Sequence, residues 1–272
     1  MSSPSGVPRT VALPMYLTHR DAEEALWASL RRYLAASGLA DLPEKLQWPV
    51  DLQSHWLDPA LLMSQACGYP LVTFLSGKVR VIGTFRYTAE GCDGHFCRSA
   101  LVVRKDNPAN SLADLRGHVL AFNSADSQSG YNSLRAMVAA LPQNKHFFSS
   151  ALRTDSHRQS LEQVNRGVCE VAALDCVTLA GLRQSQPELC DNIRVMGWTD
   201  PYPGLPLITS NQTSNETLAL LRQALTQAME DPELRQTREA LLISSFVPLQ
   251  ADDYAVCADM RQTALRRGCT EL

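Results

Sequence analysis

Two serines, a glutamine and a glycine stand together between an expected strand and an expected helix. In "FNSADSQSGYNSLRAMVAAL" (residues 122–141), an apolar strand is followed by Ser127, Gln128, Ser129 and Gly130, and apolar residues then recur at helical spacing. The first turn of a helix offers unpaired backbone amides and a partial positive charge of about half an electron. Small residues let an anion approach these donors, and serine hydroxyls can add hydrogen bonds. The segment predicts an oxyanion site, with plain helix capping by one serine as the alternative.

Two more polar residues could face the same ligand. His157 opens the helical pattern "SHRQSLEQVNRG", and Asp175 ends the apolar strand "VAALD". Open α/β sheets bind ligands at the carboxyl ends of their strands. The alternatives are a surface or packing histidine and an aspartate that caps the helix beginning at Cys176. A carboxylate beside a dianion is repulsive unless a proton or a cation lies between them. We therefore expect a zwitterion, such as an aminoalkyl phosphonate, or an oxyanion that carries an acidic proton.

Three tyrosines close expected elements in the first part of the chain. Tyr16, Tyr69 and Tyr87 could wall a pocket, although each is equally suited to the core or the rim. The dinucleotide, P-loop, α/β-hydrolase and zincin motifs are all absent from the sequence. We therefore expect no catalytic residue, no cofactor and no metal site.

Strand and helix patterns alternate over most of the chain. Strands are expected at 10–15, 70–75, 79–85, 100–104, 118–123, 170–174, 192–198 and 205–210. Helices are expected at 19–38, 58–68, 111–117, 130–141, 160–167, 176–184, 215–230, 231–242 and 252–268. This alternation predicts an α/β fold with mainly parallel sheets.

Two segments are typical of domain boundaries: "GCDGHFCRS" (91–99) and "TDPYPGLP" (199–206). If the chain leaves a first lobe and returns to it at these points, residues 1–100 and 204–272 form lobe 1 and residues 101–203 form an inserted lobe 2. Two crossings would give a hinge and a cleft between the lobes, which is a common place for a ligand.

Composition narrows the class of protein. The chain has 272 residues, 45% hydrophobic content and a net charge of −3, with no basic stripe for nucleic acid. No segment is apolar enough to span a membrane. The first twenty residues lack the pattern of a secretory signal, which predicts a cytoplasmic protein, or a periplasmic one if this sequence is a processed form.

The eight cysteines are interpreted as buried free thiols. A zinc site built on Cys92, His95 and Cys97 lacks a second pair of ligands. A disulfide between Cys67 and Cys92 stays open for an oxidising compartment.

The order of these motifs resembles that of the phosphate/phosphonate-type solute-binding proteins of ABC transporters, in the type 2 periplasmic-binding-protein superfamily. The resemblance covers residues from about 10 to about 250 and is most specific over 111–178. It implies two α/β lobes that close on a ligand. It also implies an anion-binding loop, which matches Ser127, Gln128, Ser129 and Gly130. A ligand-contacting histidine and an acidic residue after a strand match His157 and Asp175. A tyrosine after the first strand matches Tyr16, and a later aromatic residue matches Tyr87 or Tyr69.

Two departures from the family pattern stand out. Gln128 takes the place where the family often has threonine, which could reshape the anion pocket, and the export signal is missing. The leading interpretation is a solute-binding protein for a small oxyanionic or zwitterionic ligand, with an ABC permease as the implied partner. The alternatives are a cytosolic enzyme that uses His157 or Asp175 as general acid or base, and a cytosolic ligand sensor.

Overall fold

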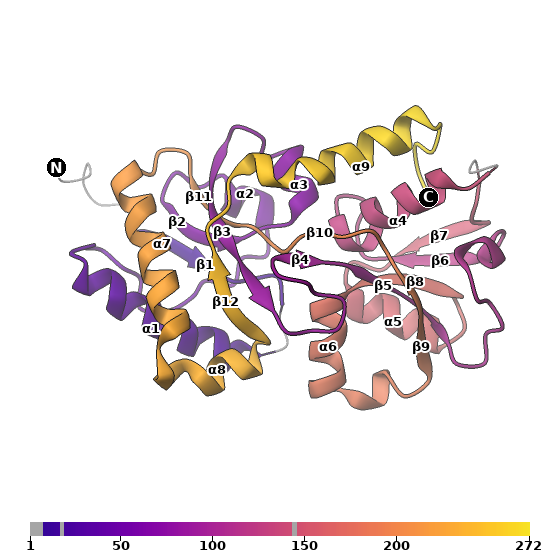
Figure 1. Ribbon diagram of the computed structural model, residues 1–272, viewed down its shortest axis with the longest axis horizontal. Helices are drawn as coiled ribbons and strands as arrows, with labels where there is room; N and C mark the ends of the chain where they lie inside the picture. The colour runs from indigo at the N-terminus through magenta and orange to yellow at the C-terminus, as the bar shows by residue number, and fades with distance from the viewer. Residues whose placement is uncertain (1–7, 17–18, 143–145) are drawn as a thin grey trace.

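The protein has two lobes, each built on a five-stranded sheet covered by helices (Figure 1). The computed structural model describes residues 8–16, 19–142 and 146–272. The first sheet contains, in spatial order, β1 (Thr10–Ala12), β2 (Leu61–Gln65), β11 (Leu207–Ser210), β3 (Val79–Tyr87) and β12 (Ile243–Val247). The second contains β7 (Ser150–Arg153), β6 (Val119–Phe122), β8 (Val171–Asp175), β5 (Ser99–Arg104) and β9 (Ile193–Trp198).

The helices surround these sheets. Those of the first lobe are α1 (Arg20–Ala36), α2 (Leu52–Trp56), α3 (Gly68–Val72), α7 (Asn215–Glu230) and α8 (Arg235–Ala240). The second lobe contains α4 (Ser133–Ala140), α5 (His157–Asn165) and α6 (Cys176–Ser185), and α9 (Ala255–Arg266) follows the last strand. Short helical turns cover Leu112–Leu115, Gln128–Asn132, Pro187–Leu189, Pro232–Leu234 and Ala251–Tyr254. None of the helices in the described ranges is both long and apolar enough to cross a bilayer.

Both sheets are mixed, so the expectation of mainly parallel sheets is wrong. Parallel pairing joins β1 to β2 and β6 to both β7 and β8. The strands that follow each crossing between lobes, β5 and β11, run antiparallel to both of their neighbours. The α/β class itself is confirmed, because helices connect the parallel pairs in the way that the alternating pattern indicates.

The two crossings lie side by side. β4 (Phe96–Cys97) and β10 (Tyr202–Pro203) form a two-stranded antiparallel ribbon between the lobes (Figure 1). The amide of Gly204 also donates a hydrogen bond to the carbonyl of His95, at 2.8 Å. This ribbon connects the sheet of residues 10–87 and 207–247 to the sheet of residues 99–198.

The tail of the chain does not stay with the first lobe. In Figure 1, α9 runs from the first lobe to the second, where the C-terminus lies. Ala264 and Cys269 are buried in one core with Leu134 and Val138 of α4. Cys257 and Met260 of the same segment belong to the first core, so α9 packs against both lobes, and the lobe bounds stay a prediction.

Two of the expected elements are wrong. The segment 58–68 was expected as a helix because it begins with Asp-Pro and ends with Gly, but it contains β2, all of whose five residues are buried. The segment 70–75 was expected as a strand, but its first half belongs to α3. Short apolar runs do not distinguish a buried strand from a buried helix by periodicity alone.

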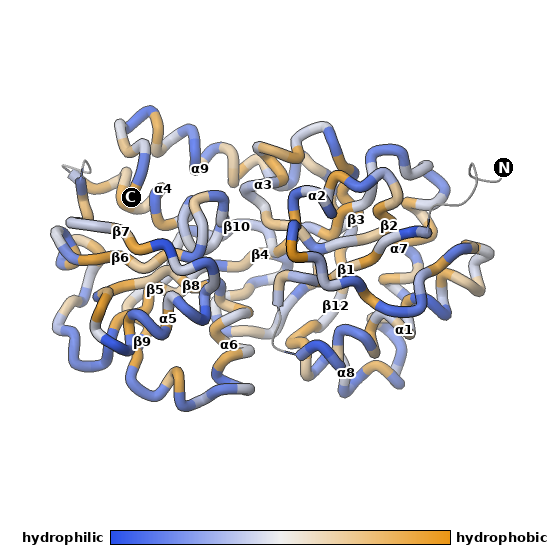
Figure 2. The backbone as a smooth tube through the Cα atoms, turned by 180° about the vertical axis from the view of Figure 1, so that it is seen from behind, coloured by the Kyte–Doolittle hydropathy of each residue, from blue (hydrophilic) through white to orange (hydrophobic). Residues whose placement is uncertain are grey.

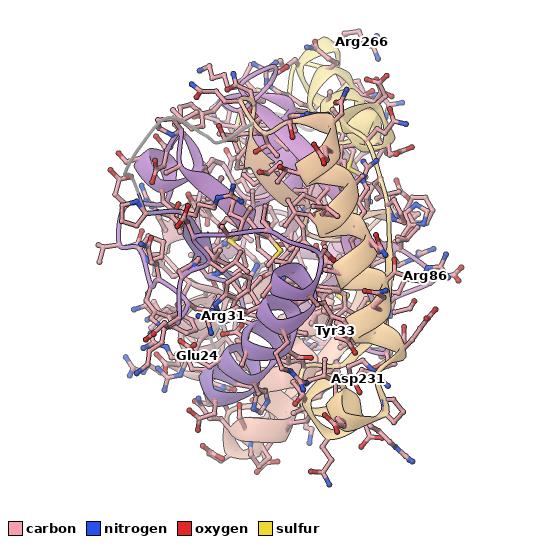
Figure 3. All side chains as sticks on the ribbon, turned by 90° about the vertical axis from the view of Figure 1, so that its left-hand side faces the viewer. Glu24, Arg31, Tyr33, Arg86, Asp231 and Arg266 are labelled. Carbon is pink, nitrogen blue, oxygen red and sulfur yellow. The ribbon has the colours of Figure 1, made fainter. Side chains whose placement is uncertain are left out.

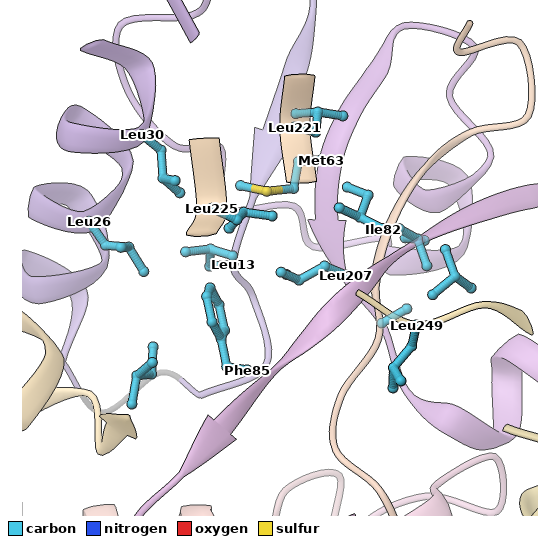
Figure 4. Close-up of a cluster of buried hydrophobic side chains, with 14 of the residues drawn as sticks. Leu13, Leu26, Leu30, Met63, Ile82, Phe85, Leu207, Leu221, Leu225 and Leu249 are labelled. Carbon is cyan, nitrogen blue, oxygen red and sulfur yellow. The ribbon is translucent and has the colours of Figure 1, made fainter. Parts of the chain in front are cut away.

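Amphipathic helices close the first core, as α1 illustrates. One face of this helix is buried, with Leu26, Leu30 and Leu34 each about 1% exposed. Leu26 and Leu30 point at Leu225 of α7 and at the sheet (Figure 4). The outer ends of α1 and α7 are joined by the hydroxyl of Tyr33, which donates to the Asp231 carboxylate at 3.0 Å (Figure 3).

The second sheet is covered on both faces, so its central strands β8 and β5 are buried and mostly apolar. Along β5, Ala100 and Val102 face the core formed with α5 and α6, whereas Leu101 and Val103 face the core formed with α4. Figure 2 shows hydrophobic colour along these strands and hydrophilic colour on the surrounding loops. The sheet therefore forms a rigid support for the loops at its edge.

Candidate functional site

A cavity of about 740 Å³ lies between the two lobes and is lined by both. Its first-lobe wall includes Met15, Tyr16, Leu52, Trp56 and Cys67. Its second-lobe wall includes Asn123, Ser127, Ser129, His157 and Asp175. The volume is ample for a small ligand.

Three helix starts converge on the second-lobe wall. β7, β6 and β8 are adjacent and parallel, so their carboxyl ends meet at one edge of the sheet. The residues that follow them begin α5, the turn before α4, and α6. Ser127, His157 and Asp175 stand at these three starts, and all three line the cavity. The site therefore has the positive ends of three helices directed at one place.

The two serines of the opening segment have different partners. The Ser127 hydroxyl caps the helix by accepting a hydrogen bond from the Gly130 amide, at 3.0 Å. The Ser129 hydroxyl is hydrogen-bonded to Nε2 of His157, at 2.9 Å, and lies 3.4 Å from the Ser127 hydroxyl. Because burial lowers the pKa of His157 to about 4, its imidazole is neutral at pH 7. The site thus combines hydroxyls with a neutral ring and places no charge on His157.

Gly130 is required by close packing. A Cβ atom at this position would lie 1.9 Å from Oδ1 of Asn123 and 3.1 Å from Cε1 of His157. Asn123 lines the cavity, and its Oδ1 is buried without a protein partner. Asn123 was not among the residues predicted from the sequence, although a polar residue directly after an apolar strand was a signal that could have identified it.

Asp175 both caps a helix and faces the cavity. Its Oδ1 accepts hydrogen bonds from the amides of Val177 and Thr178, each at 2.9 Å. Burial, with a smaller contribution from Cys176, raises the pKa of this carboxyl to about 7. Near neutral pH it can therefore hold or release a proton beside a bound ligand.

The cations in the lining are already engaged. Arg153 pairs with Asp155 at 2.8 Å, and Arg158 pairs with Glu162 at 3.1 Å. Both arginines are more than half exposed. Recognition of an anion here would depend on neutral donors and helix starts more than on these charges.

The three candidate tyrosines occupy different places. Tyr16 lines the cavity, and its buried hydroxyl acts on the Asp175 carboxyl as a hydrogen-bond donor. Tyr87 contacts the Tyr16 ring edge-on, with centroids 5.5 Å apart, and its hydroxyl accepts from Gln65 at 3.3 Å. Tyr87 lines a small neighbouring pocket, and Tyr69 lines neither cavity. The structure thus brings Tyr16 to the main site and Tyr87 behind it.

Gln128 belongs to the contact between the lobes and is not in the cavity lining. Its amide side chain is hydrogen-bonded to Asn132, at 2.8 Å, and contacts the sulfur of Met260 in α9, at 3.2 Å. Its backbone amide donates to the sulfur of Cys67, at 3.2 Å. Cys67 and Cys92 are both free thiols, so the disulfide that the sequence left open is not present.

The chain belongs to a family of substrate-binding proteins. The model of the family described as "ABC transporter, phosphonate, periplasmic substrate-binding protein" matches residues 51–254, and the family is one of transporter components and not of enzymes. The phosphonates-binding periplasmic protein of Escherichia coli (strain K12) is 27% identical over 182 residues, which are 65% of this chain and 52% of that protein. The chain thus spans about half the length of that curated relative.

Solved structures show the same two-lobed fold, that of type 2 periplasmic binding proteins. PhnD1 from Prochlorococcus marinus, in complex with methylphosphonate, has a TM-score of 0.74 and 15% identity, covering 96% of this chain and 98% of that one. PA3383 from Pseudomonas aeruginosa, a binding component of an ABC phosphonate transporter, has a TM-score of 0.74 and 17% identity, covering 96% and 88%. XAC2383 from Xanthomonas citri, bound to ATP, has a TM-score of 0.69 and 18% identity, covering 96% and 98%.

Proposed function

We propose that this chain captures a small phosphonate- or phosphate-like oxyanion, or a zwitterion that carries such a group, in the cavity between its lobes. The observation that carries the proposal is the set of buried polar groups around one cavity, where Asn123 Oδ1 has no hydrogen-bond partner and the Tyr16 hydroxyl has only the Asp175 carboxyl beside it. Buried polar groups are normally hydrogen-bonded, so their common position indicates a polar ligand. The family and the three helix starts favour an oxyanion.

Asp175 narrows the ligand class within this proposal. A carboxyl with a pKa of about 7 is compatible with an anion when a proton lies between them, or when the ligand brings its own ammonium group. Sulfate offers neither a proton nor a cation at neutral pH. We therefore expect the site to prefer phosphonate, hydrogen phosphate and aminoalkyl phosphonate over sulfate.

Calorimetry at pH 8 with methylphosphonate, phosphate, 2-aminoethylphosphonate and sulfate tests this proposal. The wild type should bind the first three at least about tenfold more tightly than sulfate, because one charge-assisted hydrogen bond contributes roughly 1.5–3 kcal/mol. Asp175→Asn should reduce that preference. Asp126→Asn, at an exposed position of the same lining, is the matched control. Equal affinities across the series in wild type and Asp175→Asn would contradict the assignment of Asp175.

The transport role extends the same proposal. An ABC permease is the partner that the family implies, and the periplasm is the compartment that the family description gives. Fractionation of the native cells, followed by uptake of the identified ligand with and without the chain, tests both. Recovery of a chemically altered ligand after incubation would instead favour the enzyme alternative.

A further inference from the structure

Three thiols from distant parts of the chain meet beside the hinge. Cys92 and Cys97 belong to the first crossing segment, and Cys176 is the first residue of α6. The sulfur of Cys92 lies 3.7 Å from that of Cys97 and 3.4 Å from that of Cys176. All three sulfurs lie within 4.8 Å of one another, and no other such group of three potential ligands occurs among the described residues.

These separations suit a metal ion. Zinc-to-thiolate bonds of about 2.3 Å in a tetrahedral site place neighbouring sulfurs about 3.8 Å apart. Two of the three separations lie within a few tenths of an ångström of that value, and the third, between Cys97 and Cys176, is at most 4.8 Å. An ion could therefore enter with little movement of the chain, whereas a disulfide of about 2.05 Å would draw two sulfurs together and leave the third thiol unused.

We propose that Cys92, Cys97 and Cys176 bind a soft divalent metal ion of the zinc class through three thiolates. Thiolates are the ligands that such ions prefer, and the protons displaced from the thiols pass to solvent. Cys97 and Cys176 are about 2% and 1% exposed, whereas Cys92 is half-buried and leaves one side open to a water ligand.

The zinc site that was considered from the sequence, and not favoured there, used His95 with the first two cysteines. In the structure the His95 ring lies against the Phe96 ring, with centroids 4.1 Å apart, and is not part of the group. The missing ligand comes from Cys176, more than seventy residues further along the chain, and the spacing between nearby residues could not reveal it.

A metal ion bound by these three cysteines would connect the hinge to the second lobe. Cys97 pairs with Tyr202 in the ribbon that joins the lobes, and Cys176 directly follows Asp175, which faces the cavity. An ion held by the three thiolates would tie the start of α6 to the hinge. Since it binds only the folded protein, it should raise the melting temperature in proportion to its affinity.

Titration of the reduced, metal-free full chain with Cd²⁺ tests the proposal, because cadmium thiolates absorb in the near ultraviolet. We expect one Cd²⁺ per chain, displacement by Cd²⁺ of Zn²⁺ that was loaded beforehand, and protection of Cys92 from alkylation, mapped by mass spectrometry. Cys92→Ser and Cys176→Ser should each weaken binding by more than about 100-fold, since even the loss of an outer-shell partner can cost 10–100-fold. Cys190→Ser, also half-buried but outside the cluster, should bind like wild type.

Absence of one-to-one binding in the wild type, with Cys92 alkylated equally fast with and without metal, would overturn the proposal. A disulfide between two of the three cysteines in protein purified without oxygen would overturn it equally. Both observations use the unmodified chain, so a variant that fails to fold does not affect them. No phosphonate is present in the experiment, which keeps its result independent of the proposed ligand.

Discussion

The two walls of the cavity differ in what they offer a ligand. The second-lobe wall presents Ser127, Ser129, His157 and Asp175 from helix starts at the edge of a covered sheet, so the backbone fixes their positions. The first-lobe wall presents Met15, Leu52, Trp56 and the ring of Tyr16 from loops and a short helix. We infer that the second lobe recognises the charged group, while the first excludes water and so strengthens those hydrogen bonds.

Removing both serine hydroxyls should weaken ligand binding more than any other change to the cavity lining considered below. For Ser127→Ala/Ser129→Ala we expect methylphosphonate to bind at least about 100-fold more weakly, because two hydrogen bonds to a charged group contribute roughly 1.5–3 kcal/mol each. Ser124→Ala, which changes a third serine of the same lining, should stay within about tenfold of wild type. Calorimetry measures all three proteins, and a double variant that binds like wild type would place the anion elsewhere.

The pH dependence of stability should reveal the two opposed titrating groups of the second-lobe wall. His157 has its pKa lowered from 6.5 to about 4, so its contribution to stability is lost as pH falls across that interval. Asp175 has its pKa raised from 3.8 to about 7, so its contribution is lost as pH rises. Each contribution is on the order of 3 kcal/mol between pH 4 and 6.5, and the two oppose each other in the wild type.

Urea unfolding at the two ends of this interval separates the contributions. His157→Gln should become less stable as pH rises, and Asp175→Asn should become less stable as pH falls. His118→Gln, at an exposed site, should follow the wild type. Identical pH slopes in all four proteins would contradict the burial of both groups.

Gly130→Ala should disturb the recognition wall through packing. The new Cβ would displace Asn123 and press on His157, and overpacking of this kind costs about 1–3 kcal/mol of unfolding free energy. Gly197→Ala is the matched control, because a Cβ there meets nothing within 4 Å. If Gly130→Ala matches Gly197→Ala in both stability and methylphosphonate affinity, close approach of Asn123 is not needed.

A smaller effect is expected from the first-lobe wall. Tyr16→Phe removes one buried hydroxyl that lies beside the Asp175 carboxyl and should weaken binding by about 1 kcal/mol. Tyr87→Phe, behind it, should leave affinity unchanged, since the Tyr87 hydroxyl already accepts from Gln65. A loss for Tyr16→Phe as large as that of the double serine variant would show that recognition is shared between the lobes.

The smallest effect on affinity is expected at Gln128. Its side chain lies against Asn132 and Met260 outside the cavity, so Gln128→Thr should keep the order of preference among phosphonate, phosphate and sulfate. The variant should lose about 1 kcal/mol of stability with its hydrogen bonds. A changed order of ligand affinities in calorimetry would show instead that Gln128 shapes the anion pocket.

Local signals in the sequence were sufficient to place Ser127, His157 and Asp175 at helix starts, because capping and periodicity are properties of neighbouring residues. Their contact with a ligand stays a prediction. The same signals misassigned 58–68, because β2 is buried along its whole length and shows no alternation. Gly130 was predicted as part of the anion-binding loop. The close approach of Asn123, which leaves no room for a Cβ atom at position 130, could not be predicted, because it depends on how the chain folds between these residues.

Features that depend on distant contacts could not be predicted. Gln128 faces α9, which lies more than a hundred residues away in sequence, so its contact with Met260 could not be read from the neighbouring residues. The return of α9 to the second lobe and the meeting of Cys176 with Cys92 have the same origin. Spacing within one segment carries no information about such pairs.

A crystal structure of the protein with methylphosphonate would test the central claim most directly. We predict the phosphonate oxygens within hydrogen-bonding distance of the Ser127 and Ser129 hydroxyls and the His157 ring, with the methyl group toward the first-lobe wall. A phosphonate group held instead by Arg153 and Arg158 at the rim, or a cavity without methylphosphonate at saturating concentration, would contradict the assignment of recognition to the helix starts of the second lobe.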